Sequence, residues 1–91
     1  MLDVRILDEA QEILDALSEK HRHQIVKKIA LLAQQPYHPR SKQLEGYAPL
    51  RRMSSGEYRI VYFIEGKVLK VPLIDKRGDN KVYRRLKQLF G

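Results

Sequence analysis

The hydrophobic and polar positions of this 91-residue chain change their period along its length, and this change predicts the order of its elements. Residues 2–7 alternate apolar and charged side chains, as a half-buried strand does. Two segments with apolar residues at helical spacing follow, one capped by Asp8 and one running from about residue 21 to 35. The short link between them predicts an antiparallel helical hairpin that packs on a sheet.

The second half of the chain has the pattern of an antiparallel meander. After a proline-containing loop at 37–49, strands are expected at 50–54, 57–64 and 67–74, with turns at Ser55-Gly56 and Glu65-Gly66. Pro72 lacks an amide donor, which predicts a bulge or an exposed edge in the last strand. A polar loop and a helix at 81–90 close the chain. We therefore expect one α+β domain over residues 1–91, with an N-terminal strand, a helical hairpin, a three-stranded antiparallel meander as its sheet and a short C-terminal helix.

The composition indicates a reducing compartment and favours an anionic partner. Cysteine is absent, no apolar run is long enough to span a membrane, and the acidic N-terminus does not resemble an export signal, so we expect a cytoplasmic protein. Lys/Arg and Asp/Glu balance at seven each in residues 1–45, whereas residues 46–91 hold eleven against four and carry the whole net charge of +7. This asymmetry favours a polyanionic partner over the alternative of a merely solubilising surface.

Metal and cofactor chemistry finds little support in the sequence. The histidines, His21, His23 and His38, lack the spacing of a helical metal site, and no glycine-rich phosphate loop is present. The sequence does not exclude a Ser-His-Asp triad, although the predicted turn is enough to explain the presence of Ser54 and Ser55. We expect no cofactor and no metal, so any catalysis would depend on Arg, Lys and Tyr.

The hairpin RRMSSGEYR contains the first cluster of candidate site residues. A two-residue loop at Ser55-Gly56 would place Arg52 directly opposite Arg59, whereas a three-residue loop would place Arg52 opposite Tyr58. Facing arginines repel, and they make sense if an anion, best a phosphate, sits between the guanidinium groups. The alternative is two solvated arginines that splay apart.

The segment DKRGDNKVYRR contains the second cluster. Lys76 and Arg77 precede Tyr83, and an aromatic ring beside basic side chains is typical of sites that hold an unstacked base and its phosphate. The alternative for Tyr83 is an aromatic at the edge of the core.

Together, LEGYAPLRRMSSGEYRIVYF and IDKRGDNKVYRR make the chain similar to the RelE/ParE superfamily of toxins from type II toxin–antitoxin systems. The resemblance implies a RelE-like fold and, for the RelE branch, an endoribonuclease (mRNA interferase) that needs no metal and cuts mRNA in the ribosomal A site by 2′-hydroxyl attack. It also implies a cognate antitoxin as partner, and operator DNA bound only by the toxin–antitoxin complex.

Four residues match the catalytic positions of the RelE branch: Arg52, Arg59, Arg77 and Tyr83. The chemistry of RNA cleavage fits this set: Arg52 and Arg59 can bracket the phosphate. Arg77 would act on the leaving group as general acid or, in better agreement with the high pKa of arginine, as charge stabiliser. Tyr83 would stack on or orient a base, with proton transfer as an alternative role. Leu50 stands where relatives have a second lysine, so Lys76 or Lys42 is expected to supply that charge. The expected RNA- and ribosome-binding residues are Lys42, Arg51, Lys76, Lys81, Arg84 and Arg85.

Two other functions compete with the nuclease. The ParE branch shares the fold and inhibits DNA gyrase by binding, without nuclease chemistry, and a plain nucleic-acid-binding module would present the same basic face. The presence of both strand arginines together with the late Arg77 and Tyr83 favours the RelE branch.

Overall fold

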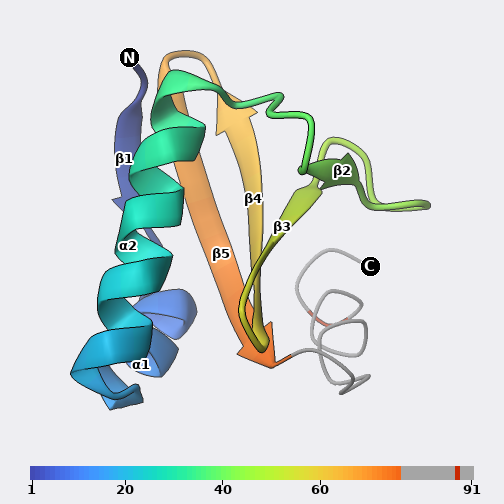
Figure 1. Cartoon of the computed structure of the whole chain (residues 1–91). Helices are drawn as coiled ribbons and strands as arrows, with labels where there is room; N and C mark the ends of the chain where they lie inside the picture. Colours follow the sequence, from blue (N-terminus) through green and yellow to red (C-terminus); the bar gives the residue numbers. More distant parts are fainter. Residues whose placement is uncertain (77–87, 89–91) are drawn as a thin grey trace.

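A computed structural model of the chain describes residues 1–76 and residue 88 (Figure 1). In chain order its elements are β1 (Asp3–Ile6), α1 (Asp8–Ala16), α2 (Glu19–Gln34), β2 (Lys42–Gln43), β3 (Arg51–Ser55), β4 (Tyr58–Glu65) and β5 (Val68–Lys76). The expected C-terminal helix lies outside the described residues. Among the helices that are described, none has both the length and the apolar character needed to cross a bilayer.

The five strands form one mixed sheet in the order β1-β5-β4-β3-β2. The predicted antiparallel meander corresponds to β3, β4 and β5, but the sheet is larger than predicted. β1 joins it in parallel beside β5, and β2 pairs with β3 inside the stretch expected to be a loop. The prediction missed β2 because its two residues have no strand-like pattern of their own, and only pairing with Arg51 and Arg52 makes them a strand.

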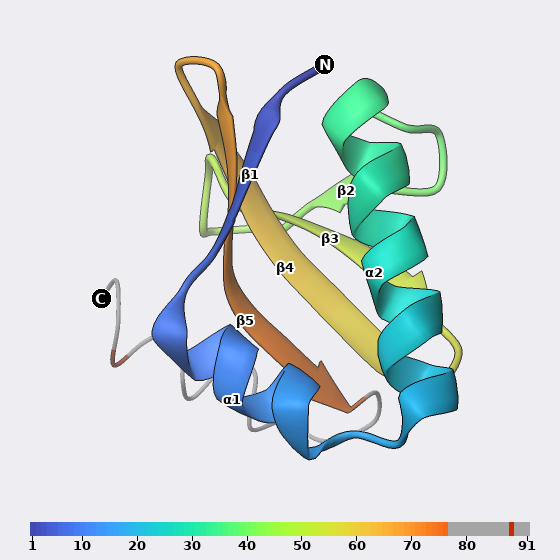
Figure 2. The same cartoon turned by 90° about the vertical axis from the view of Figure 1, so that its left-hand side faces the viewer.

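Both helices cover the same face of the sheet, as two perpendicular views show (Figures 1 and 2). α2 buries Ile25, Ile29, Leu32 and Ala33, the stripe that its spacing predicts. Its N-cap is Ser18, whose Oγ accepts a hydrogen bond from the backbone nitrogen of His21.

The shorter helix α1 differs in two details from the prediction. Asp8 is its first residue rather than its cap, because Leu7 holds the N-cap position without a side-chain hydrogen bond. The Asp8 carboxylate still lies in the first turn, where the helix dipole favours it. Ala10 and Leu14 are buried, but Ile13 is 37% exposed, so the apolar stripe is only partly covered.

The sheet has an apolar cluster on each face. Below α1 and α2, the first cluster joins the helices to Met53, Ile60, Tyr62, Leu69, Val71 and Ile74. On the opposite face, which we call the second face, a smaller second cluster consists of Leu44, Leu50, Val61 and Leu73, with Tyr47 and Phe63 packed against it.

Both hairpin turns lie one residue later than predicted, and the glycine conformation gives the reason. Gly56 and Gly66 have φ of +59° and +62°, and no residue other than glycine has positive φ in the described chain. Glycine with positive φ followed by a residue with negative φ is the pattern of a type II′ turn, in which glycine comes first. The β3–β4 loop is therefore Gly56-Glu57, and Ser55 pairs with Tyr58.

The predicted irregularity at Pro72 is confirmed as a bulge within the sheet rather than an exposed edge, because β5 lies between β1 and β4. Val61 pairs with Leu73, but two residues further along β4 Phe63 pairs with Lys70, so the register shifts between them. As a result, Lys70 and Leu73 share the second face.

Candidate nucleic-acid interface

The two hairpin arginines share the second face of the sheet, but they are not directly opposite each other. Arg52 pairs with Val61 and Arg59 pairs with Ser54, so the predicted register is wrong. The correct register makes Arg52 and Arg59 diagonal neighbours on adjacent strands, with Cβ atoms about 7 Å apart, within reach of long side chains. The two arginines therefore still share one face of the sheet, but they are farther apart than the predicted register allowed.

The residue directly opposite Arg52 is Lys42 on β2, not Arg59 as predicted. It pairs directly with Arg52 across β2 and β3, so that two cations face each other at the edge of the sheet. Lys42 is exposed and Arg52 half-buried, and in the part of the chain that the structure describes neither forms an ion pair. Lys42, Arg52 and Arg59 thus place three positive charges on three adjacent strands.

A carboxylate accompanies these cations. Asp75 pairs with Arg59 across β4 and β5 and is half-buried, and its Oδ1 accepts a hydrogen bond of 2.7 Å from the backbone nitrogen of Lys76. Asp75 is not among the site residues expected from the sequence, although it lies two residues after Leu73 on the same strand and so on the same face. We call Lys42, Arg52, Arg59 and Asp75 the charged cluster, and its formal charge is +2.

Arg51 extends from the face that the helices cover, as its position beside Arg52 requires. Its Nη2 donates a hydrogen bond of 2.8 Å to Ser41 Oγ, and its guanidinium carbon lies 5.1 Å from the ring centre of Tyr37. These contacts give Arg51 a structural role in fastening the 37–41 segment to β3.

Lys76 is also separated from the charged cluster. It pairs with Tyr58, on the helix-covered face, and its Nζ lies 3.8 Å from Glu57 Oε2. Of the two lysines expected to compensate for Leu50, only Lys42 shares the face of Arg52. Leu50 itself is 3% exposed within the second cluster and anchors the loop before β3.

Five of the expected site residues lie outside the described residues. They are Arg77, Lys81, Tyr83, Arg84 and Arg85.

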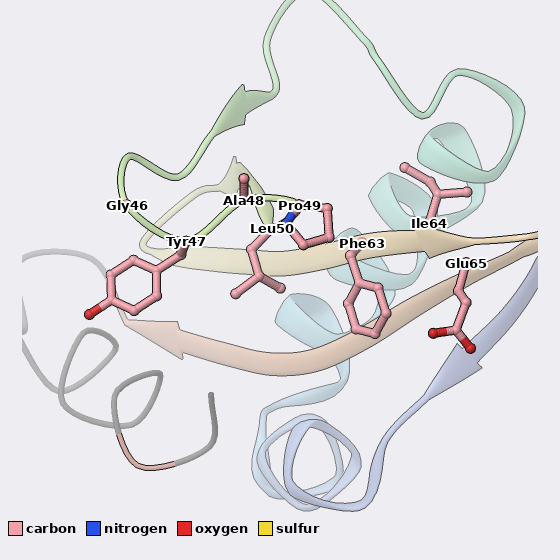
Figure 3. A pocket seen from close by; sticks show the side chains of 8 residues that line it. All are labelled: Gly46, Tyr47, Ala48, Pro49, Leu50, Phe63, Ile64 and Glu65. Atoms are coloured by element: carbon pink, nitrogen blue, oxygen red, sulfur yellow. The ribbon is translucent and has the colours of Figure 1, made fainter. Parts of the chain in front are cut away.

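Next to the charged cluster the second face contains a hollow of about 460 Å³. It lies between residues 46–50 and the end of β4, and its lining is Gly46, Tyr47, Ala48, Pro49, Leu50, Phe63, Ile64 and Glu65. In Figure 3 the rings of Tyr47 and Phe63 lie on the same side of β4, with Leu50 between them. The hollow could not be expected from local sequence patterns, because the two rings come from segments sixteen residues apart.

An ion pair lies at the β5 side of this hollow. Lys70 Nζ donates a hydrogen bond of 2.8 Å to Glu65 Oε1 and lies 6.0 Å from the ring centre of Phe63. The hydrogen bond and the charge of Lys70 hold the pKa of the Glu65 carboxyl below its ordinary value of 4.5. At neutral pH the carboxylate is therefore compensated by a lysine that also contacts the aromatic ring.

The chain matches one family model and several solved structures. The model of the ParE toxin of type II toxin–antitoxin system, parDE, matches residues 4–81. No curated protein gives a sequence match.

Several of the similar solved structures are RelE toxins. An archaeal RelE–RelB complex from Pyrococcus horikoshii OT3 is 27% identical, with a TM-score of 0.73 over 85% of this chain and 96% of that chain. A double mutant of the E. coli toxin RelE in the free state is 20% identical, with a TM-score of 0.82 over 99% of this chain and 98% of that chain. The intact E. coli RelBE toxin–antitoxin complex is 23% identical, with a TM-score of 0.75 over 87% and 100%.

Proposed function

Because this chain belongs to the RelE/ParE superfamily of toxins from type II toxin–antitoxin systems, we propose that it cuts messenger RNA on the ribosome. The reaction would be phosphodiester cleavage by the neighbouring 2′-hydroxyl, in the A site of a translating ribosome. Such cleavage would inhibit translation in the cytoplasm.

The observation that carries this proposal is the charged cluster on the second face. Lys42, Arg52 and Arg59 come from three adjacent strands, and backbone pairing fixes their spacing. Guanidinium groups suit a phosphate because their planar donors match its oxygens. Asp75 offsets only one of the three positive charges, so repulsion still disfavours the cluster in the free protein. A bound phosphate would remove that repulsion.

Cleavage by the 2′-hydroxyl needs a proton acceptor for the attacking oxygen, stabilisation of the phosphorane and compensation of charge on the leaving 5′-oxygen. Arg52 and Arg59, as diagonal neighbours, would bracket the phosphate and hold its added charge. In other enzymes one oriented donor of this kind lowers the barrier by about 2.7–4 kcal/mol. Lys42 would supply the further cation that Leu50 cannot.

Two more roles are assigned to residues outside the described part of the chain. Arg77 would stabilise the leaving oxygen, since the ordinary pKa of arginine is too high for an efficient acid. Tyr83 would stack on or orient a base.

The proposal includes partners. A cognate antitoxin would cover Arg52 and Arg59 or displace the segment 82–90, and an acidic chain that folds on binding would suit the charge of the cluster. In the solved complexes that this chain resembles, the toxin RelE is bound to RelB. The toxin–antitoxin pair, rather than the toxin alone, would bind operator DNA.

Cell-free translation tests the proposed reaction. The purified protein is added to a translating extract, and the 5′ ends of a reporter message are mapped. We expect cuts within codons of translated message and none in the same RNA without ribosomes. Arg52→Ala and Arg59→Ala should each slow cleavage by about a hundredfold to a thousandfold with the fold intact by circular dichroism. Lys27→Ala, on the exposed side of α2, is the matched control.

The second candidate function is inhibition of DNA gyrase, which the match to the ParE family model favours. On this account the same basic face binds a protein or DNA surface and no bond is cut. Inhibited supercoiling by gyrase, together with intact messages in the translating extract, would support this function and contradict the nuclease.

A further inference from the structure

We propose that the hollow between residues 46–50 and β4 is a subsite for one unpaired base of the RNA, next to the phosphate held by the charged cluster. This inference rests on the proposed function for its ligand, because it takes the anion at the cluster to be an RNA phosphate. It adds a place where the RNA is held by stacking rather than by charge.

The position of the hollow follows from the strand register. Phe63 is two residues beyond Val61 on β4, and Val61 is the residue directly opposite Arg52. Residues two apart on a strand share a face and lie about 7 Å apart. The distance between Val61 and Phe63 along β4 is therefore comparable with the distance between successive phosphates of an extended single strand of RNA. A strand whose phosphate lies at Arg52 can therefore place the adjoining base over Phe63.

The loop that carries Tyr47 is held in place by backbone hydrogen bonds. The backbone nitrogen of Tyr47 donates to the carbonyl oxygen of Leu44 at 3.1 Å, and that of Leu50 donates to the carbonyl oxygen of Tyr47 at 2.8 Å. A third bond of 2.9 Å joins Leu44 to Leu50. These bonds join residues of the loop to the residue just before β3, so Tyr47 is held beside Phe63 before any ligand binds. A preformed site lowers the entropic cost of binding.

The lining suits a flat aromatic ligand. Tyr47 and Phe63 are half-buried, so each ring keeps an exposed part while its other part packs on the second cluster. Leu50 and Pro49 complete an apolar wall between them (Figure 3). Stacking on such rings accepts any base, since every base has a π-face.

Charge favours a nucleotide over an apolar peptide as the occupant. Within the charged cluster, Arg52 lies nearest to the hollow in register, because it pairs with Val61, two residues before Phe63. On the other side, Lys70 pairs with Phe63 itself. Glu65, the acidic residue of the lining, is paired with Lys70 at 2.8 Å. The cation available for a phosphate beside the base is therefore Arg52, which forms no ion pair within the described residues, whereas Lys70 is already paired with Glu65.

A fluorescent oligonucleotide tests this subsite without ribosomes and without cleavage. The probe is a short RNA that carries 2-aminopurine beside a 2′-O-methyl nucleotide, which prevents 2′-hydroxyl attack. We expect the protein to quench the 2-aminopurine and to bind an abasic version more weakly. Tyr47→Leu and Phe63→Leu keep apolar volume but remove the ring, and each should weaken binding by about fivefold to a hundredfold.

Two further variants separate stacking from general damage. Tyr47→Phe restores the ring and should recover most of the affinity that Tyr47→Leu loses. Val26→Ala removes an apolar side chain on α2, outside the hollow and 45% exposed, and should bind the probe as the unmodified protein does. Equal binding of abasic and complete probes, or undiminished binding by both leucine variants, would overturn the subsite. The latter result would point to an apolar protein segment as occupant.

The subsite and the nuclease can fail separately. Normal quenching by a protein that leaves translated messages intact would contradict the nuclease and support the subsite. Cleavage of translated messages by a protein whose leucine variants bind the probe normally would support the nuclease and contradict the subsite.

Discussion

Lys42 on β2 lies directly opposite Arg52 on β3, with both side chains on the second face of the sheet. Like charges in this relationship destabilise a sheet by about 0.2–1 kcal/mol. An anion bound at both side chains would remove the repulsion, so the proposed phosphate binding would offset a cost in stability that the free protein bears.

Replacing Lys42 should therefore change activity and stability in opposite directions. For Lys42→Ala we expect cleavage of ribosome-bound message to slow by about tenfold, because one charged hydrogen-bond donor to the phosphate is lost. The free energy of unfolding should rise by up to about 1 kcal/mol, because Arg52 loses its like-charged neighbour. Cleavage rates and urea titrations measure the two effects. With Lys27→Ala as control, a loss of both activity and stability in Lys42→Ala would contradict this account.

Replacing Asp75 should strengthen binding of RNA. Asp75→Asn removes the negative charge opposite Arg59 and keeps an oxygen that can accept the hydrogen bond from the Lys76 backbone. Affinity for a non-cleavable RNA should rise by about threefold at low salt, and the gain should shrink as salt screens the charges. Fluorescence anisotropy at two salt concentrations measures it, with Asp15→Asn on α1 as the matched change. Weaker binding would instead mean that Asp75 orients Arg59 for the phosphate.

The hairpin turn should depend on glycine at position 56. Gly56 has φ of +59°, and a side chain in that conformation costs about 1–2 kcal/mol. Gly56→Ala should lower the free energy of unfolding by about that amount, and Gly56→Asn by less, because asparagine tolerates positive φ better. Glu57→Ala, one residue later, should change it by less than about 0.5 kcal/mol. Thermal or urea unfolding compares the variants. Equal effects at positions 56 and 57 would argue against a type II′ turn here.

The Glu65–Lys70 contact should respond to acid in a defined direction. Because the folded protein holds the Glu65 pKa below 4.5, its ordinary value, the contact stabilises the fold fully at pH above that value. This contribution is lost as the pH falls through the lowered pKa. A carbon-13 NMR titration of the Glu65 carboxyl should have a midpoint below 4.5, and Lys70→Met should move it back toward the ordinary value. An unchanged midpoint in Lys70→Met would show that another group lowers it.

Local pattern was sufficient for most elements. The stripe of α2 and the apolar, β-branched run of β4 are properties of short segments, and both occur where predicted. Burying an apolar stripe against any apolar surface is favourable, so the helical or strand periodicity of the apolar residues indicates the element whatever the fold. Pro72 likewise predicted the bulge, because the lack of a backbone N–H donor is a property of that residue alone.

Non-local pairing could not be predicted in the same way. The short strand β2 and the parallel placement of β1 depend on partners distant in the sequence. Glycine was recognised at both turns, but its place within each loop depends on φ, and a shift of one residue changed every cross-strand neighbour.

The sequence by itself determined which residues are available: a basic second half, two arginines in neighbouring strands, and the segments that resemble the RelE/ParE superfamily. The tertiary structure decided which of them meet. It made Arg52 and Arg59 diagonal rather than directly opposite neighbours and brought Lys42 opposite Arg52. It also placed Asp75 opposite Arg59, and Tyr47 and Phe63 in the lining of one hollow. Charge and apolar character belong to each residue and can be read along the chain, whereas the distance between two side chains depends on how separate strands pair.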